Sequence, residues 1–149
     1  MINALHKTDF YEWTKQTVNA LKTGDIMALD FESLIEEIED LGASKERELE
    51  NRLTVLLAHL LKWQFQHSYR AWDISGKSWT LTIEEQREQI KWLMEENPSL
   101  KSKLDRCFLK GYKSAILRAS KETNLEKSAF PTECPYTWEQ IMNNDFYPE

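Results

Sequence analysis

Hydrophobic residues recur along most of the chain at the three- and four-residue intervals typical of amphipathic helices. This spacing predicts four main helices, over residues 9–22, 31–66, 79–96 and 99–122. Asp9 and Asp30 are suited to cap the first two of them. Glycine and proline, with four residues each, are too few for a sandwich or barrel, which needs many turns. We therefore expect an all-α protein with an up-down, four-helix bundle-like fold and one long central helix.

Gly42 interrupts the second predicted helix and allows two interpretations. A glycine after an amphipathic run commonly ends a helix, and Ser44 could then cap a new one. The apolar stripe nevertheless keeps its phase through the glycine at about 3.6 residues per turn. Its members are Phe31, Ile35, Ile38, Leu49, Leu53, Leu56, Leu60 and Trp63. We favour one helix of roughly 54 Å, with Gly42 letting another backbone approach closely.

The end of the chain is predicted to fold back on the bundle as a short helical clamp. Thr137 and Gln140 can form a capping box at the start of a short helix that carries Trp138. The pattern over residues 67–78 is less regular, and it predicts no single conformation there. Because no repeat or linker divides the 149 residues, we expect one domain.

Composition and cysteine usage indicate a cytoplasmic protein. The longest apolar run, Leu53 to Leu61, is about half a membrane span, and the first residues do not form a signal peptide pattern. The two cysteines, Cys107 and Cys134, lack metal-site spacing and are expected to be free thiols. No cofactor is predicted.

A series of short motifs resembles one known family. In order these are DFYEW, EEIEDLG, HLLKWQ, SW followed by I-x-E-Q-R, NPSL, FP with CPYT, and DFYPE. Together they resemble the bacterial family called domain of unknown function twenty-nine, abundant in cyanobacteria, from about Asp9 to Pro148. The resemblance implies an all-helical bacterial protein and supplies no established reaction, ligand or catalytic residue.

Charge is segregated along the chain more than the formal net charge of −6 suggests. Residues 31–50 hold eight acids and two bases, whereas residues 100–121 hold seven bases and one acid, so the local net charges are −6 and +6. Four bases recur on one face of the last long helix: Lys103, Arg106, Lys110 and Lys113. Such a stripe is either a solvated face or a contact for an acidic protein, for the acidic helix of another copy, or for a phosphate backbone.

The central helix carries four candidate ligand-binding residues, Glu37, Glu48, Arg52 and His59. Arg52 lies in or beside the apolar stripe, where an unpaired charge would cost several kcal/mol. Glu48, one turn earlier, can pair with Arg52, and either Glu37 or an acid on the helix predicted over residues 79–96 could complete the network. The group is either structural, fixing helix register, or a pocket for a small anionic ligand or substrate. A dinuclear metal site is not predicted, because leucine stands three residues before His59.

Three functions follow from these features. The first is a non-enzymatic helical interaction module or regulatory partner protein, because no nucleophile, phosphate-binding or dinucleotide-binding motif occurs. The second is an enzyme or ligand-binding protein with the four-residue pocket. The third is RNA binding through the basic stripe and the aromatic segment WQFQHSYRAW. We favour the first function, and we expect the protein to bind a protein partner or to form a homo-oligomer.

Overall fold

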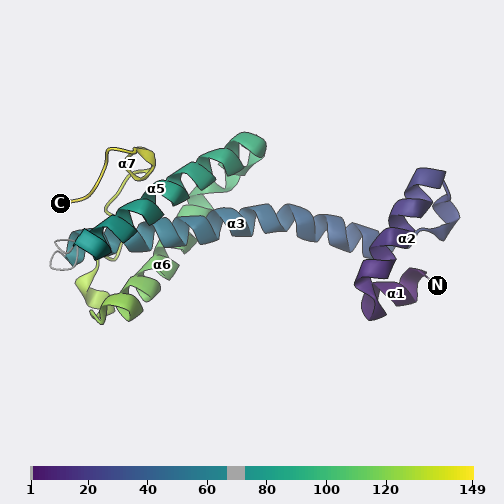
Figure 1. The fold of residues 1–149 in the computed structure, drawn as a ribbon, viewed down its shortest axis with the longest axis horizontal. Helices are drawn as coiled ribbons and strands as arrows, with labels where there is room; N and C mark the ends of the chain where they lie inside the picture. The colour runs from purple at the N-terminus through teal and green to yellow at the C-terminus, as the bar shows by residue number, and fades with distance from the viewer. Residues whose placement is uncertain (1, 67–72) are drawn as a thin grey trace. The chain divides into compact units, whose positions relative to one another are not determined.

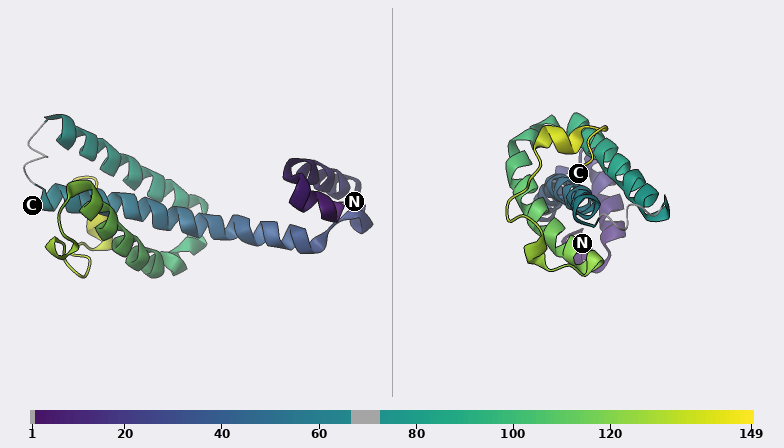
Figure 2. Two further views of the ribbon diagram at one scale, coloured as in Figure 1. Left: turned by 90° about the horizontal axis from the view of Figure 1, so that it is seen from below. Right: turned by 90° about the vertical axis from the view of Figure 1, so that its left-hand side faces the viewer.

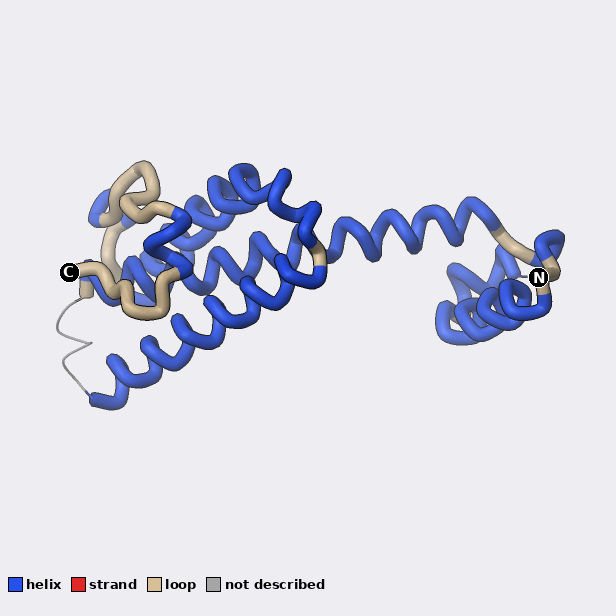
Figure 3. Tube along the Cα trace, turned by 90° about the horizontal axis from the view of Figure 1, so that it is seen from above, coloured by secondary structure: helices blue, strands red, loops and turns tan. Residues whose placement is uncertain are grey.

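A computed structural model describes residues 2–66 and 73–149, and its regular elements in these ranges are all helices (Figure 3). The α-helices are α1 (Ile2–Thr8), α2 (Phe10–Thr23), α3 (Phe31–Phe65), α5 (Asp73–Glu96), α6 (Leu104–Thr123) and α7 (Trp138–Met142). Short 3-10 helices are η1 (Ile26–Ala28), η2 (Pro98–Lys103) and η3 (Lys127–Ala129). The predicted all-α class is confirmed.

Residue contacts divide the chain into two compact units, residues 1–44 and residues 45–149. Each unit is described by itself below, and the helix α3 contributes residues to both. That the chain forms a single domain stays a prediction.

The helix α3 runs through Gly42 without a break, as the phase of its apolar stripe predicted. The close backbone approach predicted at Gly42 is wrong, because a Cβ atom built there meets no other atom within 4 Å. The close approach occurs instead at Gly111 of α6. A Cβ atom there would lie 3.1 Å from the Leu53 Cβ and 3.4 Å from the Glu50 carbonyl oxygen. Glycine at 111 therefore sets how closely α6 packs on α3.

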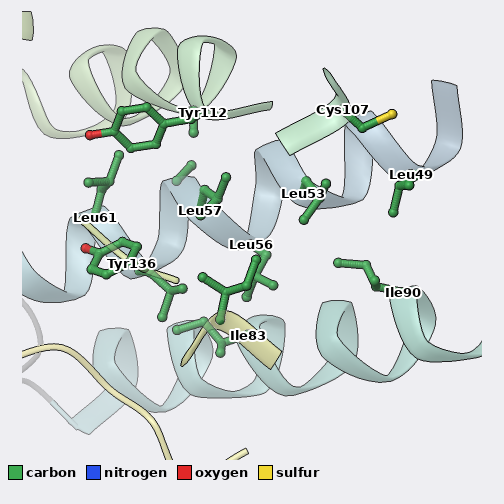
Figure 4. Packing of buried hydrophobic residues seen from close by; sticks show 14 of the residues in the cluster. Leu49, Leu53, Leu56, Leu57, Leu61, Ile83, Ile90, Cys107, Tyr112 and Tyr136 are labelled. Atoms are coloured by element: carbon green, nitrogen blue, oxygen red, sulfur yellow. The ribbon is translucent and has the colours of Figure 1, made fainter. Parts of the chain in front are cut away.

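The core of residues 45–149 forms around the C-terminal half of α3. The α5 and α6 helices lie on either side of it, and consecutive long helices reverse direction, which confirms the up-down character (Figure 1). The end-on view shows α5, α6 and the C-terminal segment around α3 (Figure 2). From Val55 to Leu61 α3 is apolar at all positions except His59, and the leucines of this half of the helix are 0% exposed. They are Leu49, Leu53, Leu56, Leu57, Leu60 and Leu61. Figure 4 shows several of them packed between the neighbouring helices.

The predicted C-terminal clamp is present in this unit. Thr137 and Gln140 form the capping box at the start of α7, and Ile141 in α7 is 0% exposed. The Tyr136 hydroxyl donates to Gln64 Oε1 of α3 at 2.7 Å. The clamp thus adds buried side chains and a long-range hydrogen bond to the core.

Aromatic rings join the end of α3 to the same C-terminal segment. Phe65 contacts Phe130 with ring centroids 5.7 Å apart, and Trp63 contacts Tyr147 at 5.0 Å. These two aromatic residues of WQFQHSYRAW therefore take part in packing. The remaining residues of that motif from His67 to Trp72, including Tyr69 and Arg70, lie outside the described residues.

The unit of residues 1–44 contains α1, α2 and the start of α3. The Asp9 side chain accepts from the Glu12 N–H at 3.0 Å, as predicted, and Gly24 ends α2 in the left-handed conformation. Asp30 caps α3 through the Ser33 N–H and hydroxyl. The short helix α1 was not predicted.

The first predicted helix, residues 9–22, is not part of the main buried cluster as the four-helix core required. That cluster is made by α3, α5, α6 and the C-terminal region, whereas α2 buries Trp13, Thr17 and Ala20 within its own unit. Its apolar residues Phe10 and Leu21 remain 49% and 54% exposed. Periodicity identified the apolar face of α2 but not what covers it.

Two other helix starts differ from the prediction. The α5 helix begins at Asp73, six residues before the predicted start, and continues through Gly76, because continued backbone hydrogen bonding outweighs the roughly 1 kcal/mol helix penalty of a glycine. The segment after Asn97 begins as the 3-10 helix η2 with Pro98 at its first turn, and α6 follows from Leu104.

Gly42 of α3 and Gly111 of α6 should respond oppositely to substitution by alanine. Gly42→Ala should raise the free energy of unfolding by about 1 kcal/mol, because alanine is the better helix former and its Cβ has open space. Gly111→Ala should lower it by about 1–2 kcal/mol, because the buried Leu53 Cβ cannot move away. Urea unfolding followed by circular dichroism measures both changes. Destabilisation by Gly42→Ala would contradict an unbroken α3.

Candidate functional site

The predicted pocket residues Glu48 and Arg52 meet in the structure. Arg52 Nε donates to Glu48 Oε2 at 3.3 Å, and an Arg52 terminal nitrogen donates to Gln86 Oε1 of α5 at 3.3 Å. The Arg52 side chain is 29% exposed. The predicted ion pair lies within α3, and the Arg52–Gln86 hydrogen bond ties α3 to α5.

The other two predicted pocket residues have different partners. Glu37 accepts from His6 Nε2 of α1 at 2.7 Å, within the unit of residues 1–44. His59 is buried, and its Nδ1 donates to the Val55 carbonyl oxygen at 2.8 Å. It lies two turns beyond Arg52, about 10 Å along the helix. Of the four predicted pocket residues, only Glu48 and Arg52 are joined to each other by a hydrogen bond in the described part of the chain.

An ionic group lies near His59, in which Lys62 is buried whereas Glu122 and Arg118 are exposed. Lys62 Nζ donates to Glu122 Oε2 at 2.5 Å and lies 5.4 Å from the centre of the Trp79 ring. Arg118 Nε donates to the other Glu122 oxygen at 2.8 Å. Burial lowers the pKa of His59, and the positive charge of Lys62 lowers it further. The Lys62–Glu122 ion pair links α3 to α6, so this group holds the core together.

The sequence missed the most deeply buried charge, Arg87 of α5, which is 2% exposed. Its guanidinium donates to the carbonyl oxygens of Ile141 at 2.6 Å and Phe146 at 2.7 Å, and it lies 5.3 Å from the Tyr147 ring centre. A guanidinium here satisfies chain-end carbonyls that no helix pairs. The sequence signal that could have identified Arg87 as buried is its position four residues after Ile83, on the same face of the helix.

The basic stripe is formed by Lys103, the last residue of η2, with Arg106, Lys110 and Lys113 of α6, and all four are exposed. Arg106 pairs with Glu46 of α3, so one member is engaged within the chain. Among the described residues, the other three have no acid within ion-pair distance. Three lysine ammonium groups are therefore available to a partner.

Apolar side chains lie among these bases. Leu109 is 58% exposed and Leu117 is 45% exposed on the same side of α6. Beside them a cleft of about 440 Å³ lies between α6 and the segment after Pro131, lined in part by Phe108, Leu109, Tyr112 and Lys113. The α6 surface thus combines positive charge, exposed leucines and a partly aromatic cleft.

Neither cysteine has the features of a reactive thiolate. Both are free, and burial raises the pKa of Cys134, at the cleft wall, to about 11. Burial also raises the pKa of Cys107, so both thiols are protonated near neutral pH. Within the described ranges no group of three or more His, Cys, Asp or Glu residues is arranged to hold a metal ion.

The fold and this surface define an all-α protein, and none of its described helices is long and apolar enough to cross a membrane. Residues 5–147 match the family described as Domain of unknown function DUF29, and the chain belongs to that family. No curated protein and no solved structure matches the chain.

The buried His59 should make stability depend on pH. Its pKa in the folded state is lowered, so as pH falls through about 6.5 the unfolded chain binds the proton first and stability is lost. The loss ends once the pH falls below the folded-state pKa. His59→Gln should therefore reduce the fall in urea midpoint between pH 7 and pH 5. An identical fall in both proteins would show that His59 is not held neutral.

Proposed function

We propose that the protein is a non-enzymatic interaction module that binds an acidic, partly apolar segment of another protein through α6. The observation that carries the proposal is the exposed basic stripe with three unpaired lysines and two exposed leucines on the same side of α6. A cytoplasmic setting is part of the proposal and agrees with the two free thiols.

The chemistry of this face favours a protein partner over nucleic acid. A phosphate backbone offers no apolar surface to exposed leucines, whereas leucines beside lysines suit an amphipathic acidic helix or peptide. The net charge of the chain is −6, which opposes general attraction to nucleic acid. The adjacent cleft offers a place for one apolar side chain of such a segment.

Reversal of the three free lysines tests the proposal. Lys103→Glu, Lys110→Glu and Lys113→Glu, combined, should remove the captured partner in affinity capture from the source organism followed by mass spectrometry. Arg106 is left unchanged because its pairing with Glu46 supports the fold. Partner recovery should also fall with added salt, since exposed charges are screened.

The matched control reverses three exposed lysines on other surfaces, Lys77, Lys91 and Lys127, to glutamate. It changes the net charge equally and should leave capture intact. Equal capture by the two triple variants and the wild type would refute a role for α6. Loss of the partner after nuclease treatment would favour RNA instead.

A further inference from the structure

The unit of residues 1–44 leaves most of its large apolar side chains exposed. Ten large hydrophobic side chains in this unit are between 47% and 95% exposed. Among the described side chains of residues 5–44, only Trp13, Thr17, Ala20 and Asp30 are less than a tenth exposed. The indole nitrogen of Trp13 and the hydroxyl of Thr17 are buried without a hydrogen-bond partner. Units of this size usually need oligomerisation, a metal or disulfides to fold stably.

Six of the exposed apolar residues lie in two lines, one on each of two helices. On α2 the line contains Phe10 and Leu21, flanked by Val18, and on α3 it contains Phe31, Ile35 and Ile38 at helical spacing. Tyr11 on α2 and Leu41 on α3 add exposed apolar surface beside these lines. At roughly half exposure or more, the eight side chains offer on the order of 800 Å², comparable with the roughly 800 Å² that each partner contributes to a stable interface.

Charged residues flank both lines in a matching way. On α2, Lys15 and Lys22 are seven residues apart, and Lys22 directly follows Leu21. On α3, Glu32 and Glu39 are also seven residues apart, and each directly follows an apolar residue of the line. When two helices pack antiparallel, charged residues that lie on the same flank of the apolar line, each viewed along its own helix from the N-terminus, lie opposite each other. Lys15 would then face Glu39, and Lys22 would face Glu32.

We infer that residues 1–44 form a homodimer interface in which α2 of one copy packs antiparallel on the start of α3 of a second copy. A twofold axis repeats this contact, so each copy supplies the two lysines of its α2 to one contact and the two glutamates of its α3 to the other. A second copy of the chain presents glutamates at the spacing of the α2 lysines and lysines at the spacing of the α3 glutamates. This match is the reason for choosing a second copy as the partner of this surface. The inference goes beyond the function proposed for α6 and does not depend on it.

Charge exchange between two variants tests the inference. The first variant is Lys15→Glu with Lys22→Glu, and the second is Glu32→Lys with Glu39→Lys. In sedimentation equilibrium the wild type should be a dimer, and each variant alone should dissociate at least tenfold more readily because like charges face each other. An equimolar mixture should return to dimer, because both contacts in the mixed pair join opposite charges. Circular dichroism checks that each variant keeps its helices, because Lys15 also pairs with Glu12 at 3.1 Å.

A matched pair of apolar substitutions locates the interface. Ile35→Glu should give a monomer, whereas Leu81→Glu, on α5 and 57% exposed compared with 54% for Ile35, should remain a dimer. The inference is overturned if the wild type is a monomer at all concentrations over a 100-fold range. It is also overturned by a dimer that survives Ile35→Glu, or by a mixture of the charge variants that stays monomeric.

Discussion

The apolar stripe of α3 is the constraint on which the rest of the structure depends. From Leu49 to Leu61 this stripe is fully buried and organises the core of residues 45–149. From Phe31 to Leu41 the same stripe is more than half exposed at Phe31, Ile35, Ile38 and Leu41. Because the helix is unbroken, its two halves share one periodicity and have different surroundings. Apolar surface on this scale is uncommon on monomers and typical of interfaces.

Buried polar groups in residues 45–149 hold segments that are distant in sequence. Arg87 pairs with carbonyl groups 54 and 59 residues later, and Lys62 pairs with Glu122, 60 residues later. An unpaired group of this kind would cost about 1–3 kcal/mol, so each pairing favours one arrangement of the chain. The C-terminal segment thereby becomes part of the core. These contacts account for the buried charges through packing, without a ligand.

Features set by neighbouring residues could be predicted from the sequence. The caps at Asp9, Asp30 and Thr137 follow from local hydrogen bonding, and the phase of the stripe identified α3 as continuous through Gly42. The Glu48–Arg52 pair follows from their spacing of four residues.

Features that depend on distant segments could not be predicted in the same way. Arg87 finds backbone carbonyl groups, which leave no side-chain pattern in the sequence. Gly111, not Gly42, allows close helix packing, because only the neighbour at each site distinguishes the two glycines. The face of α2 looked like a core face, but amphipathic spacing does not specify the partner that covers it. The basic stripe was visible in sequence, although the engagement of Arg106 with Glu46 was not.

Amide hydrogen exchange along α3, measured by mass spectrometry over a range of protein concentrations, tests most directly whether its first half is covered by a second copy. Exchange in residues 49–61 should be slow at every concentration, because these residues are buried within one chain. Exchange in residues 31–41 should slow as concentration rises and dimers form. Exchange in residues 31–41 that is the same at all concentrations would contradict this view of the helix.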